Sequence, residues 1–211
     1  MRRLVLASAS PARRKLLQAA GIDPQVVVSG IDESTTAATS AEELCLLLAR
    51  RKARAVAELL RTDLTAGSLV LGCDSVLAFD GEVLGKPADA ADAVARWRRM
   101  RGRSGVLHTG HCLIEVGGPG GTDREEAAVA STTVHFAPLD ETEIQDYVAT
   151  GEPLQVAGAF TIDGLGGPFV ERIEGDHGTV VGLSLPLLRR MLADLGVRMS
   201  ELWSVREPKV D

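Results

Sequence analysis

Hydrophobic residues recur with two different periods along this chain, and its first part alternates between them. Short apolar runs at 4–6, 25–28 and 68–79 are typical of strands. The stretches that begin near Pro11 and Ser40 instead carry apolar residues three and four positions apart, which is the spacing of an amphipathic helix. The pattern therefore predicts alternating strands and helices in this part of the chain.

Later in the chain, strands follow one another directly. Two runs at 105–116 and 126–136 are separated by a glycine-rich loop at 117–121, which predicts a long antiparallel hairpin. Further helices are expected at 89–101, 140–150 and 185–195. Because alternating elements come first and hairpins later, the sequence favours one α/β domain over 1–211, with a mixed sheet flanked by helices.

Composition narrows the classes of protein. The chain has 211 residues, 45% of them hydrophobic and only 3% aromatic, so its core is expected to consist mainly of leucine, valine and alanine. A formal net charge of −6 argues against nucleic-acid binding, which needs a basic surface. No apolar run approaches the roughly 20 residues that span a bilayer. The first apolar run is too short for a signal peptide, so we expect a cytoplasmic protein without a membrane segment.

Cysteine and histidine spacing offers no metal motif. Cys45, Cys73 and Cys112 are far apart and form no CxxC pair, so free buried thiols are expected rather than disulfides or a zinc site. His108 and His111 are three residues apart in a predicted strand, and their side chains should therefore point to opposite faces. A metal site shared by these two histidines is not expected.

The start of the first helix carries an unusual charge pattern. Ser10 is a suitable N-cap and Pro11 a suitable first residue, but Arg13, Arg14 and Lys15 follow in the first turn. That end of a helix is electropositive and favours acidic residues. A bound anion would remove the conflict, and a strand followed by a serine-rich turn and a helix start outlines a phosphate site. A basic face solvated by water is the alternative, and both remain open.

Two other charged residues occupy apolar patterns. Lys52 lies on the hydrophobic line of the second helix, so it must either extend to solvent or meet an anion. Asp74 lies in the middle of the apolar run at 68–79, and aspartate is rarely buried without a partner. A turn or capping role is the alternative for Asp74, and its mid-strand position disfavours it.

A hairpin brings a further cation toward Asp74. Asp80-Gly81 is a turn signal after the strand, and the chain returns through Gly85-Lys86-Pro87. We therefore expect Lys86 to lie in the same hairpin as Asp74. Glu33, in the turn at 30–34, supplies a second carboxylate.

These charges share one chemistry. Arg13, Lys52 and Lys86 could neutralise a polyphosphate, while Glu33 and Asp74 could hold Mg²⁺ and activate a water. The combination indicates hydrolysis of a nucleotide polyphosphate. The sequence contains no GxxxxGK[ST], so it is not a P-loop enzyme.

Several short motifs, in order over about nine-tenths of the chain, resemble the Maf (septum-formation-inhibitor-like) nucleoside triphosphate pyrophosphatases. They are Ala7-Ser8-Ala9-Ser10-Pro11 with Arg13, Asp32-Glu33, Leu48-Ala49 with Lys52-Ala53, Gly72-Cys73-Asp74-Ser75-Val76, Gly85-Lys86-Pro87, His108-Thr109-Gly110, Tyr147-Val148 with Gly151-Glu152-Pro153, Ala157-Gly158 and Val180-Val181-Gly182-Leu183.

The resemblance implies a two-lobed α/β fold with a central cleft, like that of the inosine-triphosphate pyrophosphatases. It implies cleavage between the α and β phosphates of a nucleoside triphosphate with Mg²⁺ or Mn²⁺, by a cytoplasmic homodimer. Asp74 would be the proton acceptor, and Glu33 and Asp74 would hold the metal. The residues expected to contact the substrate are Ser8, Ser10, Arg13, Lys52, Ser75, Lys86 and Asp163.

The base preference is left open by three positions. One branch of the family, acting on dTTP and UTP, carries Arg, Thr and Gln there, and the 7-methyl-GTP branch carries Trp, Gln and Glu. This chain has Ala12, Ser75 and Asp163 and matches neither set. A carboxylate at Asp163 could accept a hydrogen bond from a guanine or cytosine N–H, and modified nucleotides are a further possible substrate.

Two functions from other classes are compatible with parts of the sequence. A nucleotide-sensing regulator of septum formation or cell division would bind without turnover, but it would not need Asp74 as a base. A nucleic-acid-binding adaptor is disfavoured by the acidic net charge and the scarcity of aromatic residues.

Overall fold

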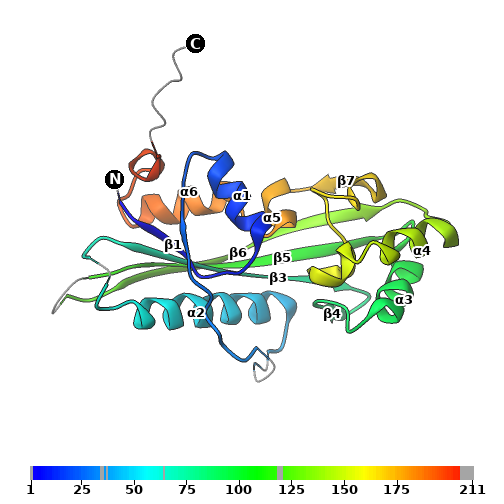
Figure 1. The fold of residues 1–211 in the computed structure, drawn as a ribbon, viewed down its shortest axis with the longest axis horizontal. Coiled ribbons are helices and arrows are strands. Elements are labelled where there is room, and N and C mark those ends of the chain that lie inside the picture. The colour runs from blue at the N-terminus through cyan, green and yellow to red at the C-terminus, as the bar shows by residue number, and fades with distance from the viewer. Residues whose placement is uncertain (1, 34–35, 37, 64, 118–120, 205–211) are drawn as a thin grey trace, which may run out of the picture.

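The computed structural model describes residues 2–33, 36, 38–63, 65–117 and 121–204. Over these residues the strands form one seven-stranded mixed sheet in the order β2-β1-β3-β5-β6-β7, with β4 paired to β3 (Figure 1). The strands are β1 (Leu4–Leu6), β2 (Gln25–Val26), β3 (Leu69–Phe79), β4 (Glu82–Leu84), β5 (Ser104–Glu115), β6 (Arg124–Phe136) and β7 (Val170–Glu174). β1 pairs in parallel with β2 and β3, and the other pairs are antiparallel, so the predicted mixed α/β sheet is confirmed.

Helices cover both faces of the sheet. α2 lies along one face, α1, α5 and α6 lie on the other, and α3 and α4 pack together at one end (Figure 1). The helices are α1 (Pro11–Ala19), α2 (Ala41–Leu59), α3 (Ala90–Met100), α4 (Glu141–Ala149), α5 (His177–Val181) and α6 (Leu185–Asp194). No helix in the described part of the chain has the length and apolar character needed to cross a membrane.

The helices begin where the sequence predicts capping residues. The Ser10 hydroxyl accepts a hydrogen bond from the Arg13 amide, and Pro11 is the first residue of α1. At the start of α2, the Ser40 hydroxyl accepts from the amide of Glu43. Each cap satisfies an amide that has no partner within its helix, so the two helices that frame the candidate site have fixed starting points.

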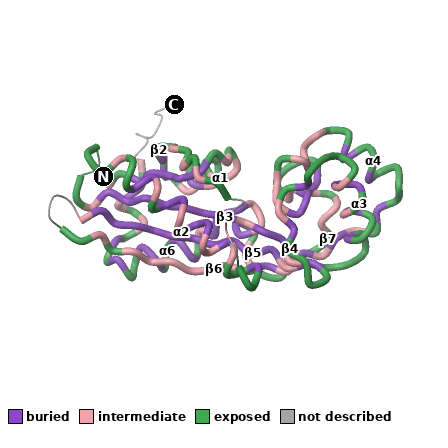
Figure 2. The backbone as a smooth tube through the Cα atoms, turned by 90° about the horizontal axis from the view of Figure 1, so that it is seen from below, coloured by how far each residue is buried: buried purple, intermediate pink, exposed green. Residues whose placement is uncertain are grey.

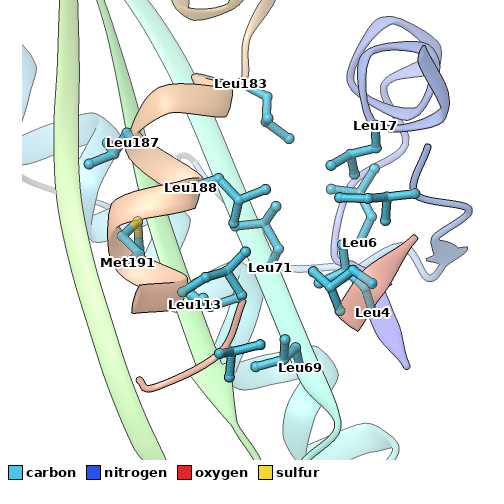
Figure 3. Packing of buried hydrophobic residues seen from close by; sticks show 14 of the residues in the cluster. Leu4, Leu6, Leu17, Leu69, Leu71, Leu113, Leu183, Leu187, Leu188 and Met191 are labelled. Atoms are coloured by element: carbon cyan, nitrogen blue, oxygen red, sulfur yellow. The ribbon is translucent and has the colours of Figure 1, made fainter. Parts of the chain in front are cut away.

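The two halves of β3 pack in different hydrophobic clusters. The first half of β3, through Leu69 and Leu71, packs with Leu188 and Met191 of α6 (Figure 3). The second half of the strand packs around Trp97 of α3. β3 is buried along most of its length and belongs to both clusters (Figure 2). The division of one domain into two lobes with a central cleft stays a prediction.

The sheet has a break at one edge of β3, between the two clusters. β1 pairs with β3 only as far as Leu71, and β4 pairs with β3 only from Leu77 onward. Among the described strands, residues 73–76 therefore have a neighbour on the β5 side alone. Asp74 lies in this break, where a strand edge is available to other groups.

Three segments differ from the sequence prediction or extend it. The predicted turn at 175–178 leads into a short helix, α5, because the Asp176 side chain caps it and Gly182, with φ of 116°, ends it. The glycine-rich segment at 155–167 contains short 3₁₀ turns. The 3₁₀ turns of the structure are η1 (Glu152–Gln155), η2 (Ala157–Ala159), η3 (Gly167–Phe169) and η4 (Met199–Leu202). The segment after Gly196 docks as far as Trp203, which forms a β-bridge with Ile22, and 205–211 lie outside the described residues.

The close approach of α2 to the sheet depends on a glycine. A Cβ atom added to Gly72 of β3 would lie 2.3 Å from the Ala49 carbonyl oxygen of α2. We expect Gly72→Ala to lower the free energy of unfolding by about 1–3 kcal/mol, because backbone atoms must move apart. Urea denaturation measures this change. Gly85→Ala is the matched control, since a Cβ there meets nothing within 4 Å, and equal losses in both variants would contradict the prediction.

Candidate active site

Lys52 of α2 lies between two carboxylates. Its ammonium nitrogen is 2.5 Å from Asp74 Oδ1 and 2.8 Å from Glu33 Oε1. The Lys52 and Asp74 side chains are each 11% exposed, whereas Glu33 is 53% exposed. Of the two alternatives for Lys52, the contact with an anion is confirmed. The structure thus brings together three of the predicted site residues, from a loop, a helix and a strand.

The environment of Asp74 makes its carboxyl group easier to protonate. Burial raises the pKa of Asp74 above its ordinary value, and the charges of Lys52 and Arg13 oppose this effect without cancelling it. A carboxylate that is partly destabilised in this way and paired with a cation has the character of a general base.

Arg13 connects the start of α1 to the break in the sheet. Its Nη1 atom donates to Ser8 Oγ and to the Cys73 carbonyl oxygen, both at 3.0 Å. Its Nη2 atom donates to Ser75 Oγ at 3.0 Å, and its Nε atom donates to the Gly182 carbonyl oxygen at 2.7 Å. The guanidinium therefore binds β3 at Cys73 and Ser75, on the stretch that has no neighbouring strand on one side. It also brings positive charge to the neighbourhood of Asp74.

The hydroxyl of Ser8 is held as a donor. Its oxygen accepts from Arg13 Nη1 and, at 3.2 Å, from the Ser10 amide. A serine oxygen has two lone pairs and one proton, so two accepted bonds leave the proton for another acceptor. Ser8 is buried at the end of β1, where it could donate to a phosphate oxygen.

Two predicted residues lie outside these contacts. Lys86 is exposed and, over the described residues, makes no hydrogen bond or ion pair, although the β3–β4 register directs the chain after Leu84 back toward Asp74. The preceding Gly85 carbonyl is fixed by the Gly158 amide and an Arg96 side chain. Asp163 is also exposed, and the structure does not bring it into contact with the Lys52 cluster. The roles of both residues stay predictions.

Sequence reasoning assigned no role to Glu152, which organises the loop that carries Asp163. The Glu152 carboxylate accepts from Thr161 Oγ1 at 2.5 Å and from the amides of Leu165 and Gly166 at 3.1 Å. These bonds lower the pKa of Glu152 despite the opposing effect of burial. The available signal was an acidic residue between Gly151 and Pro153, but its partners are nine or more residues away in the chain.

The other candidate ligands are arranged as the sequence predicts. His108 contacts Ser131 and lies near Glu42 of α2, whereas His111 contacts the start of α6, so the two point to opposite faces. Cys45, Cys73 and Cys112 are free and buried. Burial raises the pKa of the Cys73 thiol to about 11, which keeps it protonated and a poor nucleophile.

Glu33 and Asp74 are the residues that could hold a metal ion. Both contact one ammonium nitrogen, so their oxygens lie close enough to share a small ion, and carboxylate oxygens suit Mg²⁺. Within the described residues there is no group of three or more acidic, histidine or cysteine side chains that could hold a metal. Two carboxylates fit an ion whose other ligands are water and substrate phosphates.

Similarity to known proteins extends over nearly the whole chain. Residues 3–195 match the family described as Maf-like protein. A nucleoside triphosphate pyrophosphatase of Salinispora tropica is 69% identical over 202 residues, which cover 96% of this chain and 88% of the relative. A protein of the same name from Streptomyces avermitilis is 55% identical over 206 residues, covering 98% and 97% of the two chains. The chain belongs to the Maf-like protein family, as the motifs predict.

A buried histidine ties β5 to the start of α6. The Ser184 amide donates to His111 Nε2 at 2.8 Å, so the proton of the neutral ring is on Nδ1, which donates to the Thr109 carbonyl at 3.0 Å. Burial lowers the pKa of His111 to about 4. The neutral ring is needed because a protonated Nε2 could not accept from Ser184.

This histidine makes stability depend on pH. The unfolded chain takes up a proton near the ordinary pKa of about 6.5, whereas the folded chain resists protonation down to about 4. The contribution of neutral His111 to the free energy of unfolding is fully present above about pH 6.5 and is lost as the pH falls toward 4. The loss at pH 4.5 is on the order of 2–3 kcal/mol. Urea unfolding of His111→Gln at pH 7 and pH 4.5 should show a smaller pH-dependent loss than the wild type. His135→Gln, at a partly exposed position, is the control, and an equal change in both variants would contradict the assignment.

Proposed function

We propose that this protein hydrolyses nucleoside triphosphates between the α and β phosphates, producing a nucleoside monophosphate and pyrophosphate. The family and the names of the relatives support this activity. The observation that carries it is the buried Asp74 carboxylate, held 2.5 Å from Lys52 in a break of the sheet that is lined with hydrogen-bond donors. We further propose a cytoplasmic homodimer.

In the proposed reaction, Asp74 is the proton acceptor. A water molecule attacks the α phosphorus while its proton passes to an Asp74 oxygen. The new P–O bond replaces the bond to the β phosphate, and pyrophosphate leaves. Lys52 holds the carboxylate in place and reduces the unfavourable charge that the approaching phosphates create.

The phosphates are proposed to lie against the start of α1. Ser8 has a proton available for donation, and Ser10 caps the helix. Arg13 supplies charge and one N–H that none of the described residues accepts. Lys86, on the exposed segment after β4, has no partner among the described residues and is free to bind the outer phosphates. A helix start with added cations is a favourable anion site.

Glu33 and Asp74 would hold a divalent ion, Mg²⁺ or Mn²⁺. When bound, such an ion neutralises phosphate charge and makes a coordinated water more acidic. Lys52 keeps the two carboxylates together until the substrate arrives. We propose Ser75 and Asp163 as contacts for the nucleoside part.

Asp74→Asn tests the proposed reaction. We expect the variant to lose about 100- to 10,000-fold in turnover, because an amide cannot accept the proton, while nucleotide binding is largely retained. Pyrophosphate release is measured over a panel of nucleoside triphosphates, with and without Mg²⁺ or Mn²⁺. The control is Asp80→Asn, at an exposed residue of the same hairpin. Retained turnover in Asp74→Asn would overturn its role as base, and binding without turnover by the wild type would identify a sensor.

Asp163 predicts a base preference. A carboxylate accepts hydrogen bonds from the exocyclic amino groups that guanine and cytosine carry and uracil and thymine lack. GTP or CTP should therefore be hydrolysed faster than UTP or dTTP, and Asp163→Asn should reduce the difference. The specificity constants for dTTP, UTP, CTP, GTP and 7-methyl-GTP measure this preference. Turnover of the thymine and uracil nucleotides alone would contradict it.

A further inference from the structure

A line of hydroxyl groups connects the candidate site to the inside of the protein. Arg13 Nη2 donates to Ser75 Oγ, Ser75 Oγ is 2.8 Å from Thr109 Oγ1, and Thr109 Oγ1 donates to the Thr179 carbonyl oxygen at 2.8 Å. Thr109 is fully buried, and Ser75 is partly exposed. Because each hydroxyl has only one proton, the direction of every bond in this line can be worked out.

The donor and acceptor of each hydrogen bond can be assigned by starting from the buried end of the line. A carbonyl oxygen can only accept, so the Thr109 proton is used in the bond to Thr179. In the contact between Ser75 and Thr109, the proton must therefore come from Ser75. Ser75 Oγ also accepts from Arg13, which uses one of its two lone pairs. Its remaining capacity, over the described residues, is one lone pair.

We propose that Thr109 is a positioning residue that holds the Ser75 hydroxyl as a hydrogen-bond acceptor for the substrate. An ionised phosphate offers only acceptor oxygens, so Ser75 in this state cannot bind it. A nucleoside offers donors, namely the hydroxyls of the sugar and the N–H groups of the base. Ser75 therefore accepts a hydrogen bond from a donor on the sugar or base. Ser8, whose proton is available, donates to the phosphates.

The backbone around Thr109 is fixed as well. His111 Nδ1 donates to the Thr109 carbonyl, and Gly110, the next residue, lies so close to α2 that an added Cβ would be 2.3 Å from the Cys45 carbonyl oxygen. Thr179 belongs to α5. The carbonyl of Gly182, which caps the end of this helix, accepts a hydrogen bond from Arg13 Nε. The end of α5 thus holds both Arg13 and Thr109, the two partners of Ser75. Thr109 therefore has little freedom to reorient.

The inference rests on the proposed function, because it requires a nucleotide to lie against Ser75. Thr109→Val removes the acceptor for the Ser75 proton and keeps the side-chain shape, and Thr109→Ser keeps the hydroxyl. The ligands are α,β-methylene analogues of the triphosphate that the wild type binds best, and inorganic tripolyphosphate, which has neither sugar nor base. Affinities are measured by titration calorimetry, and unfolding midpoints are recorded for every variant.

We expect Thr109→Val to weaken the nucleotide analogue about three- to tenfold, the effect of one hydrogen bond, and to leave tripolyphosphate affinity unchanged. Thr109→Ser should restore nucleotide affinity to within about twofold of wild type. In the Ser75→Ala background, Thr109→Val should have no further effect, because its action passes through Ser75. Thr65→Val, at a hydroxyl pair with Ser68 outside the site, is the matched control.

Equal weakening of both ligands, or additive effects of the two substitutions, would overturn the role of Thr109. If Thr109→Val does not fold, the Ser75→Ala variant alone tests whether Ser75 contacts the nucleoside. A loss of tripolyphosphate affinity in that variant would show that Ser75 donates to a phosphate, and would overturn the proposal. Analogues that lack the 2′- or 3′-hydroxyl separate a sugar donor from a base donor. A wild type that binds the analogue but does not hydrolyse triphosphates would overturn the proposed reaction only, and one that binds no nucleotide would overturn both.

Discussion

The buried contact between Lys52 and Asp74 is the interaction on which the candidate site depends. Removing two charges from water is costly, and their attraction compensates only when the geometry is close. The closeness comes from α2, which approaches the sheet where Gly72 and Gly110 have no side chains. Lys52 lies three residues after Ala49, the residue that contacts Gly72, so its side chain reaches Asp74 directly. Close helix packing thus places Lys52 against the buried Asp74 carboxylate.

The break in the sheet explains why distant segments meet at this point. β1 turns away after Leu6, and β4 begins its pairing at Leu77, which leaves the edge of β3 open between them. Backbone groups at an open edge require partners. Arg13 supplies one by binding the Cys73 carbonyl, and the same guanidinium reaches Gly182 before α6. One side chain therefore joins the start of α1, the centre of β3 and the end of α5.

Part of the site could be predicted because its residues conflict with their local surroundings. Arginine at a helix start, lysine on an apolar stripe and aspartate in an apolar strand each need an outside partner, and the contacts of Arg13, Lys52 and Asp74 supply it. Thr109 and Glu152 show no such conflict. Threonine is common in strands, and a glutamate before proline is ordinary. Their partners, the Thr179 carbonyl for Thr109 and the loop at 161–166 for Glu152, became visible only in the structure.

The sequence by itself determined the order of the strands and of the helices other than α5, the capped starts of α1 and α2, the family and the residues whose charge needs a partner. These properties depend on neighbours within a few positions, or on side-chain types read in order. The tertiary structure alone decided that Glu33, Asp74 and Lys52 form one cluster, and that Arg13 fills the open edge of β3. It also set the direction of the Ser75 hydroxyl. The reason is physical: these bonds join atoms whose separation in space is fixed by packing of the whole sheet, and no local pattern records that distance.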